Sequence, residues 1–97
     1  MSTIAVPEIA QTLGLAEDDL IQEALRSLIK EKRRQVMEER LEILARYGAV
    51  SVDDLERKIA SGEVLEHPAW EDLIMAENLT AHLVTLNEHL KRLQPAG

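Results

Sequence analysis

Residues 17–47 form one uninterrupted run, EDDLIQEALRSLIKEKRRQVMEERLEILARY, which contains neither proline nor glycine. Apolar residues recur at spacings of three and four near both ends of the run, which is the periodicity of an amphipathic helix. Three carboxylates open it, as favoured at a helix N-terminus where exposed N–H groups attract negative charge. The run therefore predicts a helix of about 30 residues, roughly 45 Å long, which exceeds what a compact domain of this length requires.

The middle of this predicted helix, Lys30 to Gln35, has no apolar residue, so its buried stripe is interrupted there. We expect the two apolar ends to pack against different surfaces. One chain of 97 residues can hardly cover both, which predicts a homodimer. The predicted dimerisation residues are the apolar side chains of the first third, Leu20, Ile21, Leu25, Leu28 and Ile29.

Local signals place three further helices. Pro7 suits the first position of a short helix that Gly14 ends, and Pro68 likewise opens the last helix. Ser51 is a predicted N-cap, with Asp54 three residues on as a variant of the capping box. The predicted fold is all-α, with four helices near 7–13, 17–47, 52–61 and 68–94.

The N-terminal residues 2–6 alternate Ile4 and Val6 before Pro7, which is typical of an edge strand or of an extended arm. A lone strand needs a partner, so the strand would pair across a dimer. Residues 1–48, with the arm, the short helix and the long helix, are expected to serve dimerisation. Residues 49–97 are expected to form an acidic partner-binding half of the same continuous unit.

The composition narrows the class of protein. Only Tyr47 and Trp70 are aromatic and 45% of the residues are hydrophobic, so the core must be aliphatic, as in packed helices. The chain has no Cys, which excludes disulfides, thiolate zinc sites and Cys nucleophiles and agrees with a reducing compartment. No signal-peptide pattern opens the sequence and no apolar run approaches a membrane span. We expect a cytoplasmic protein without a membrane segment.

The formal net charge of −7 is unevenly distributed. Residues 47–77 hold eight carboxylates and two basic residues, whereas the basic cluster Lys30, Lys32, Arg33 and Arg34 has Glu31, Glu38 and Glu39 within a turn. Since phosphate backbones are bound largely through Lys and Arg, nucleic-acid binding is not expected. The 3–4 spacing predicts instead a solvated, partly self-paired basic face.

Catalytic and metal-binding patterns are also absent from the sequence. His82 and His89 lie on one side of the last helix but two turns apart, about 10.5 Å, which is too far for one metal ion. His67 has no further residues that complete a ligand set. No phosphate loop and no nucleophile flanked by a base is found. We therefore predict a protein that is not an enzyme and has no metal site and no cofactor.

Two features of the C-terminal half remain as candidate binding surfaces. The first is a heptad seam of Ala76, Leu79, Leu83, Leu86, Leu90 and Leu93, which suits either a partner helix or an internal face packed on the long helix. The second is Trp70, which is either a core anchor or the centre of an interface. The predicted partner-binding residues are Trp70, Leu73, Ile74, Leu79, Leu83, Leu86 and Leu90.

Residues 13–28, LGLAEDDLIQEALRSL, resemble the corresponding run of ribbon-helix-helix antitoxins, with Ile4 to Pro7 at the place of their strand. Residues 46–72, through His67-Pro68-Ala69-Trp70-Glu71-Asp72, are similar to short bacterial and archaeal proteins associated with toxin–antitoxin pairs. In the ribbon-helix-helix proteins the strand reads DNA with polar or basic side chains, whereas only Thr3 and Ala5 stand here.

The resemblance implies an antitoxin that binds a toxin through its acidic, leucine-rich C-terminal half. A basic ribonuclease is one candidate for that toxin. An acidic surface would steer a basic partner and cover a site built for phosphate. Two alternatives stay open from the sequence: a structural helical homo-oligomer and a DNA-binding autoregulator.

Overall fold

The structure, a computed structural model, describes residues 5–93 and consists of four helices in that range. They are α1 (Val6–Leu13), α2 (Glu17–Arg46), α3 (Val52–Ala60) and α4 (Glu66–Arg92). Their bounds agree with the predicted ones to within two residues. The start of α4 differs from the predicted Pro68 by two residues, but His67 is non-helical and the helix is regular only from Pro68 on. The all-α fold with one 30-residue helix is confirmed.

The predicted N-terminal strand does not appear in the part of the chain that the structure describes. Residues 2–4 lie outside that part, and Val6 is already the first residue of α1.

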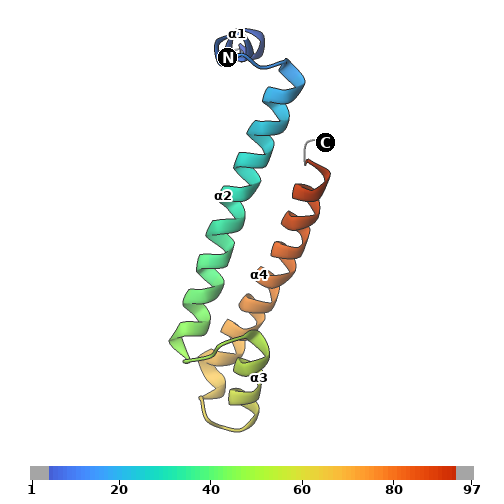
Figure 1. Cartoon of the computed structure of the whole chain (residues 1–97). Coiled ribbons are helices and arrows are strands. Elements are labelled where there is room, and N and C mark those ends of the chain that lie inside the picture. The colour runs from blue at the N-terminus through green and yellow to red at the C-terminus, as the bar shows by residue number, and fades with distance from the viewer. Residues whose placement is uncertain (1–4, 94–97) are drawn as a thin grey trace.

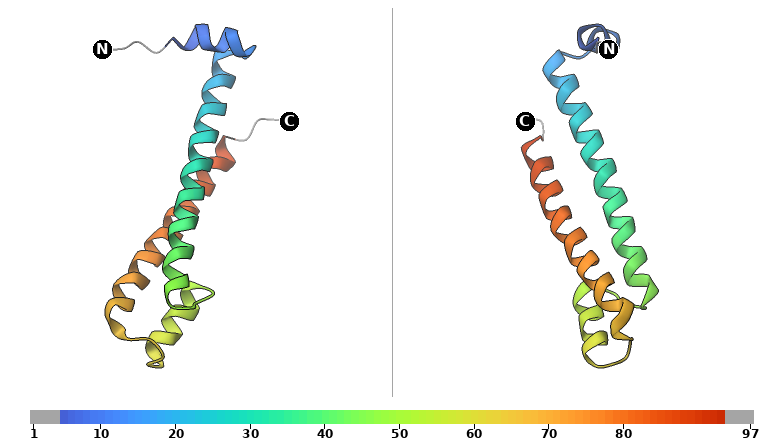
Figure 2. Two further views of the ribbon diagram at one scale, coloured as in Figure 1. Left: turned by 90° about the vertical axis from the view of Figure 1, so that its left-hand side faces the viewer. Right: turned by 180° about the vertical axis from the view of Figure 1, so that it is seen from behind.

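The two long helices form an antiparallel hairpin (Figure 1). α3 lies at the closed end of the hairpin, where it packs against α4, and α1 lies across the open end of α2 (Figure 2). The radius of gyration is 19.4 Å, against roughly 13 Å for a compact domain of this length. The chain is therefore a rod with large surface rather than a compact bundle.

The turn after α2 follows from its sequence. Gly48 has a φ of 62°, which a side chain would disfavour, and the N–H groups of Gly48 and Ala49 donate to the carbonyl oxygens of Ala45 and Leu44. This is the Schellman arrangement that satisfies the free carbonyls of a helix end. It turns the chain directly into α3.

Ser51 caps α3 as predicted. Its Oγ accepts a hydrogen bond from the backbone N–H of Asp54, and the Asp54 carboxylate accepts one from the backbone N–H of Val50, each at 3.0 Å. Both bonds fix the start of α3 at the closed end.

The core consists of two clusters along the hairpin. In the middle, Val36 of α2 packs with Leu83 and Leu86 of α4. At the closed end, Leu44, Leu55 and Leu73 bring α2, α3 and α4 together. The second cluster contains the most deeply buried large side chains, so the closed end is the best-anchored part of the molecule.

Candidate functional site

The outward side of α4 carries an exposed apolar stripe. Trp70, Ile74 and Val84 are 47%, 45% and 56% exposed, and Ala81 is exposed between the last two. At about 100° per residue these four side chains share one line along the helix, roughly opposite the side that faces α2. We call Trp70, Ile74, Ala81 and Val84 the outer stripe. It is roughly 21 Å long.

The start of the outer stripe rests on the buried closed end. Ala69 and Leu73, the neighbours of Trp70 on the inner side, are buried in the core. Asp72 accepts a hydrogen bond from the Tyr47 hydroxyl at the end of α2 and lies 3.7 Å from the Arg46 guanidinium. The hydrogen bond to Asp72, with burial, raises the pKa of Tyr47 above its ordinary value. The first turns of α4 are therefore held in one position, and Trp70 with them.

Carboxylates interrupt and border the outer stripe. Glu77 is exposed between Ile74 and Ala81, Glu88 is exposed one turn after Val84, and Glu71 pairs with His67 at 3.0 Å beside Trp70. The hydrogen bond to its own backbone and the one with His67 lower the pKa of Glu71. At neutral pH the apolar stripe is thus bordered by negative charge.

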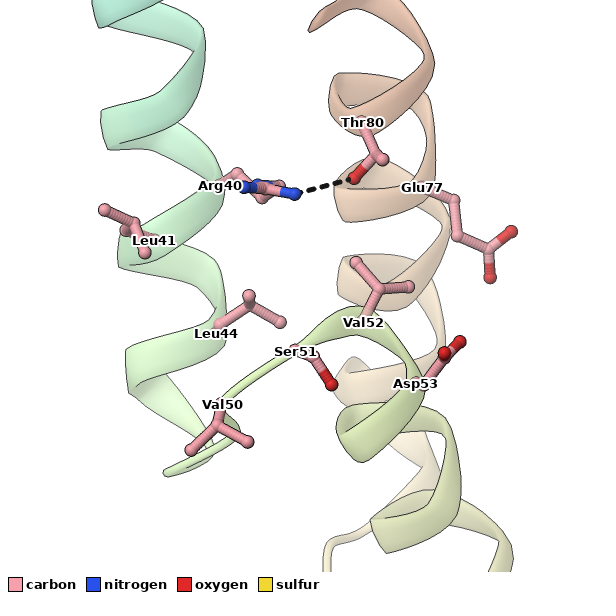
Figure 3. Close-up of a pocket in the computed structure, with 9 residues that line it drawn as sticks. All are labelled: Arg40, Leu41, Leu44, Val50, Ser51, Val52, Asp53, Glu77 and Thr80. Carbon is pink, nitrogen blue, oxygen red and sulfur yellow. Dashed lines mark hydrogen bonds between the residues drawn. The ribbon is translucent and has the colours of Figure 1, made fainter. Parts of the chain in front are cut away.

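A groove opens between α2, the start of α3 and α4, and Glu77, which lies on the side of α4 that carries the outer stripe, is among its lining residues (Figure 3). It encloses about 470 Å³, and Leu44 and Val52 form part of its apolar wall. Arg40 donates a hydrogen bond to the Oγ1 of Thr80 at 3.4 Å across it, while Glu77 points away from Arg40 toward the rim. The groove has room for a side chain of a segment that lies along the stripe.

The heptad seam is internal. Leu83, Leu86 and Leu90 are buried between α4 and α2, Leu79 is partly buried beside them, and Leu73 belongs to the core of the closed end. The structure thus favours the internal alternative for the seam, because α2 already fills the place of a partner helix. Of the predicted partner-binding residues, only Trp70 and Ile74 are exposed.

Ala81 and Val84 were not among the residues predicted from the sequence. Their spacing from Ile74, seven and ten residues, is helical and could have revealed a second stripe. The leucines of the seam, being larger, dominated the pattern.

The predicted dimerisation residues divide into two sets. Leu20 and Ile29 are partly buried, and Ile29 packs against the middle core cluster. Ile21, Leu25 and Leu28 are exposed on α2.

Two of the four residues in the basic cluster of α2 are engaged within the chain. Arg33 donates a hydrogen bond to the Oδ1 of Asn87 at 3.0 Å, and Arg34 pairs with both Glu31 and Glu38. Hydrogen bonding to Glu31 keeps the pKa of Arg34 above its usual range and lowers that of Glu31. Lys30 and Lys32 are exposed.

No metal-binding group of three or more His, Asp or Glu residues exists within residues 5–93. None of the helices described is long and apolar enough to cross a membrane.

The fold and the surface define an all-α helical hairpin with an acidic, apolar-striped outer face. The chain belongs to the uncharacterized protein MJ0235 family, whose model matches residues 1–97. No curated protein and no solved structure matches this chain.

Proposed function

We propose that this chain is an antitoxin-like, non-catalytic protein that binds and neutralises a basic toxin through the outer stripe. One observation carries the proposal: Trp70, Ile74 and Val84 are exposed in line on a helix whose opposite side is buried. A helix of this kind keeps its shape while it offers apolar area. Such a surface can bind without the cost of ordering a flexible segment.

The residue types suit a protein partner. Trp is among the side chains that most often dominate binding energy at protein interfaces, and a rim of charge around an apolar centre is the usual anatomy of such contacts. The groove beside Glu77 would accept a side chain of the partner next to the stripe.

The charge of the surface indicates the kind of partner. Residues 47–77 carry a net charge of −6, Glu77 lies between Ile74 and Ala81 of the outer stripe, and Glu88 lies one turn after Val84. A negative surface speeds encounter with a basic protein and disfavours acidic ones. A ribonuclease would fit because its phosphate-binding site is basic, and carboxylates from α4 would occupy it. The proposal places the protein with this toxin in the cytoplasm.

The test uses the product of the neighbouring gene in the source genome. Expressed alone, it should arrest growth, and co-expression of this chain should restore growth. Titration calorimetry on the purified pair then measures the effect of Trp70→Ala. Because an interface centre contributes 2 kcal/mol or more, we expect Kd to rise at least about 30-fold.

A second pair of variants separates the stripe from the rest of the surface. Ile74→Lys adds positive charge and removes apolar area within the stripe, so it should weaken the complex. The loss should be greater at low salt than at high salt, because salt screens the added repulsion. Met75→Lys makes a similar change on another side of α4, where Met75 is also exposed and does not line the groove. The proposal fails if the neighbouring product is harmless, or if Met75→Lys weakens the complex as much as Ile74→Lys.

A further inference from the structure

A second apolar surface lies at the open end of the hairpin. Ile21, Leu25 and Leu28 are 46%, 43% and 67% exposed, although they recur at the spacing of a helix seam. The first turns of α2 extend beyond the end of α4 (Figure 2), and Leu93 at the C-terminus of α4 reaches Asp19, Gln22 and Glu23 on another side of α2. Ile29, which does face α4, lies about 40°, 80° and 100° around the helix from Leu25, Ile21 and Leu28, respectively.

The residues that flank this seam have opposite charge at its two ends. Asp18 lies one turn before Ile21 and Lys32 lies one turn after Leu28, both on the seam side of α2. Neither forms an ion pair with another side chain among residues 5–93, in contrast to Arg34, which lies two residues after Lys32. Both charges are therefore available to a neighbouring molecule.

This charge pattern is complementary to that of a second copy only when the two copies of α2 run antiparallel. Asp18 and Lys32 are each seven residues, or about 10.5 Å, from Leu25. A two-fold axis beside Leu25 would bring Asp18 of one copy level with Lys32 of the second copy, twice over. A parallel arrangement would instead place Asp18 beside Asp18 and Lys32 beside Lys32, and like charges there oppose association.

We infer that the first half of α2 is a homodimer interface in which two copies pack antiparallel about Leu25. The seam of Ile21, Leu25 and Leu28 meets itself, and each Asp18 pairs with a Lys32 at the rim. The outer stripe on α4 stays free in this arrangement, since it belongs to another helix and lies mostly nearer the closed end. The dimer would therefore carry two partner-binding surfaces.

The interface is small. A standard protein interface buries about 800 Å² on each partner, and three apolar side chains of one helix supply only part of that area. A dimer with Kd on the order of micromolar is expected rather than a permanent one.

Sedimentation of the full chain over micromolar concentrations tests the dimer. We expect the mass to rise from one to two chains, and Leu25→Glu to raise Kd at least tenfold while the circular dichroism spectrum is retained. Leu41→Glu is the matched control, an exposed leucine of α2 that lies off the seam. A monomer at every concentration, or equal weakening by both variants, would overturn the inference.

Cysteine cross-linking tests the direction, since the chain has no Cys of its own. A mixture of Asp18→Cys and Lys32→Cys proteins should form a mixed disulfide dimer under mild oxidation. Each protein alone should cross-link far less. Preferential cross-linking of Asp18→Cys to itself would show a parallel pair and overturn the assignment. Neither readout involves the toxin, so a failure here leaves the proposed function standing, and the reverse also holds.

Discussion

Arg33 of α2 donates a hydrogen bond from its guanidinium to the side-chain amide oxygen of Asn87 on α4, across 3.0 Å. This bond lies in the segment of α2 that has no apolar residue, and it shows how the hairpin continues through that segment. One arginine of the basic cluster thus faces the partner helix within the chain. Two of the four basic side chains of the cluster, Arg33 and Arg34, are therefore engaged within the chain.

The first prediction is that duplex DNA binds weakly and without sequence preference. Arg33 and Arg34 are occupied by Asn87, Glu31 and Glu38, and the whole chain is acidic. Fluorescence anisotropy at physiological salt should give a Kd in or above the range of non-specific binding, roughly 1–100 μM.

A charge variant provides the comparison for DNA binding. Glu31→Gln with Glu38→Gln frees Arg34 of both carboxylates and reduces the net negative charge, so it should bind DNA more tightly. A nanomolar, sequence-dependent affinity of the unmodified chain would contradict the prediction and favour the autoregulator alternative.

The second prediction concerns the cap of α3. Ser51→Ala removes the acceptor for the Asp54 N–H, and such changes cost about 1 kcal/mol. A thermal melt should show a midpoint lower by roughly 4–8 °C. Ser61→Ala, at the other end of α3, is the control, because Ser61 only donates to a helix-end carbonyl. An unchanged midpoint for Ser51→Ala would show that the cap does not matter for stability.

The helix positions could be predicted because each boundary has a local cause. Pro7, Gly48, Ser51 and Pro68 stop or start helices through their own backbone or side-chain chemistry, which needs no knowledge of the fold. The orientation of α4 could not be predicted in this way. A heptad of leucines has the same spacing whether it meets its own chain or another, and only the position of α2 decides between them.

The candidate site shows the same limit. Trp70 was recognisable as distinctive from the sequence, but whether its side chain is buried or exposed depends on which side of α4 faces the core. Leu73, three residues on, is fully buried, although both residues share the same stretch of sequence. The segment Lys30 to Gln35 of α2, which has no apolar residue, is a further case. A polar contact such as that of Arg33 with Asn87 joins residues 54 positions apart and leaves no periodic signal in the sequence.

The third prediction is a loss of stability at high pH that depends on Tyr47. Its pKa is raised in the folded state, chiefly by the hydrogen bond to Asp72. The stabilising contribution is therefore complete below the ordinary phenol pKa of about 10 and is lost as pH rises through the higher folded value. Chemical denaturation from pH 8 upward should show the free energy of unfolding declining above about pH 10.

Tyr47→Phe isolates this effect from the titration of lysines. The variant keeps the ring at the closed-end core and lacks the hydroxyl, so it should be less stable at pH 8 by roughly 1–3 kcal/mol. The difference between the two proteins should shrink as pH rises past 10. A constant difference would mean that the pKa of Tyr47 is the same in the folded and the unfolded state.

The last prediction tests whether the heptad seam of α4 forms the core of the hairpin. Leu83 and Leu86 are each 8% exposed and pack against Val36, so truncating either one to alanine leaves a cavity and should cost about 2–5 kcal/mol. A chain of this size has roughly 5–15 kcal/mol in total. The double variant Leu83→Ala with Leu86→Ala should thus lose most of its helical circular dichroism at 25 °C.

Val84 offers the matched control because it lies between the two leucines and faces outward on the same helix. Val84→Ala removes exposed area and raises helix propensity, so its free energy of unfolding should stay within about 0.5 kcal/mol of that of the unmodified chain. If the double leucine variant kept the melting midpoint of Val84→Ala, the seam would not be the core, and α4 would have to present it to a partner. If the leucine variant unfolds while Val84→Ala loses only toxin binding, the two sides of α4 have separate roles: one side holds the hairpin together and the other binds the partner.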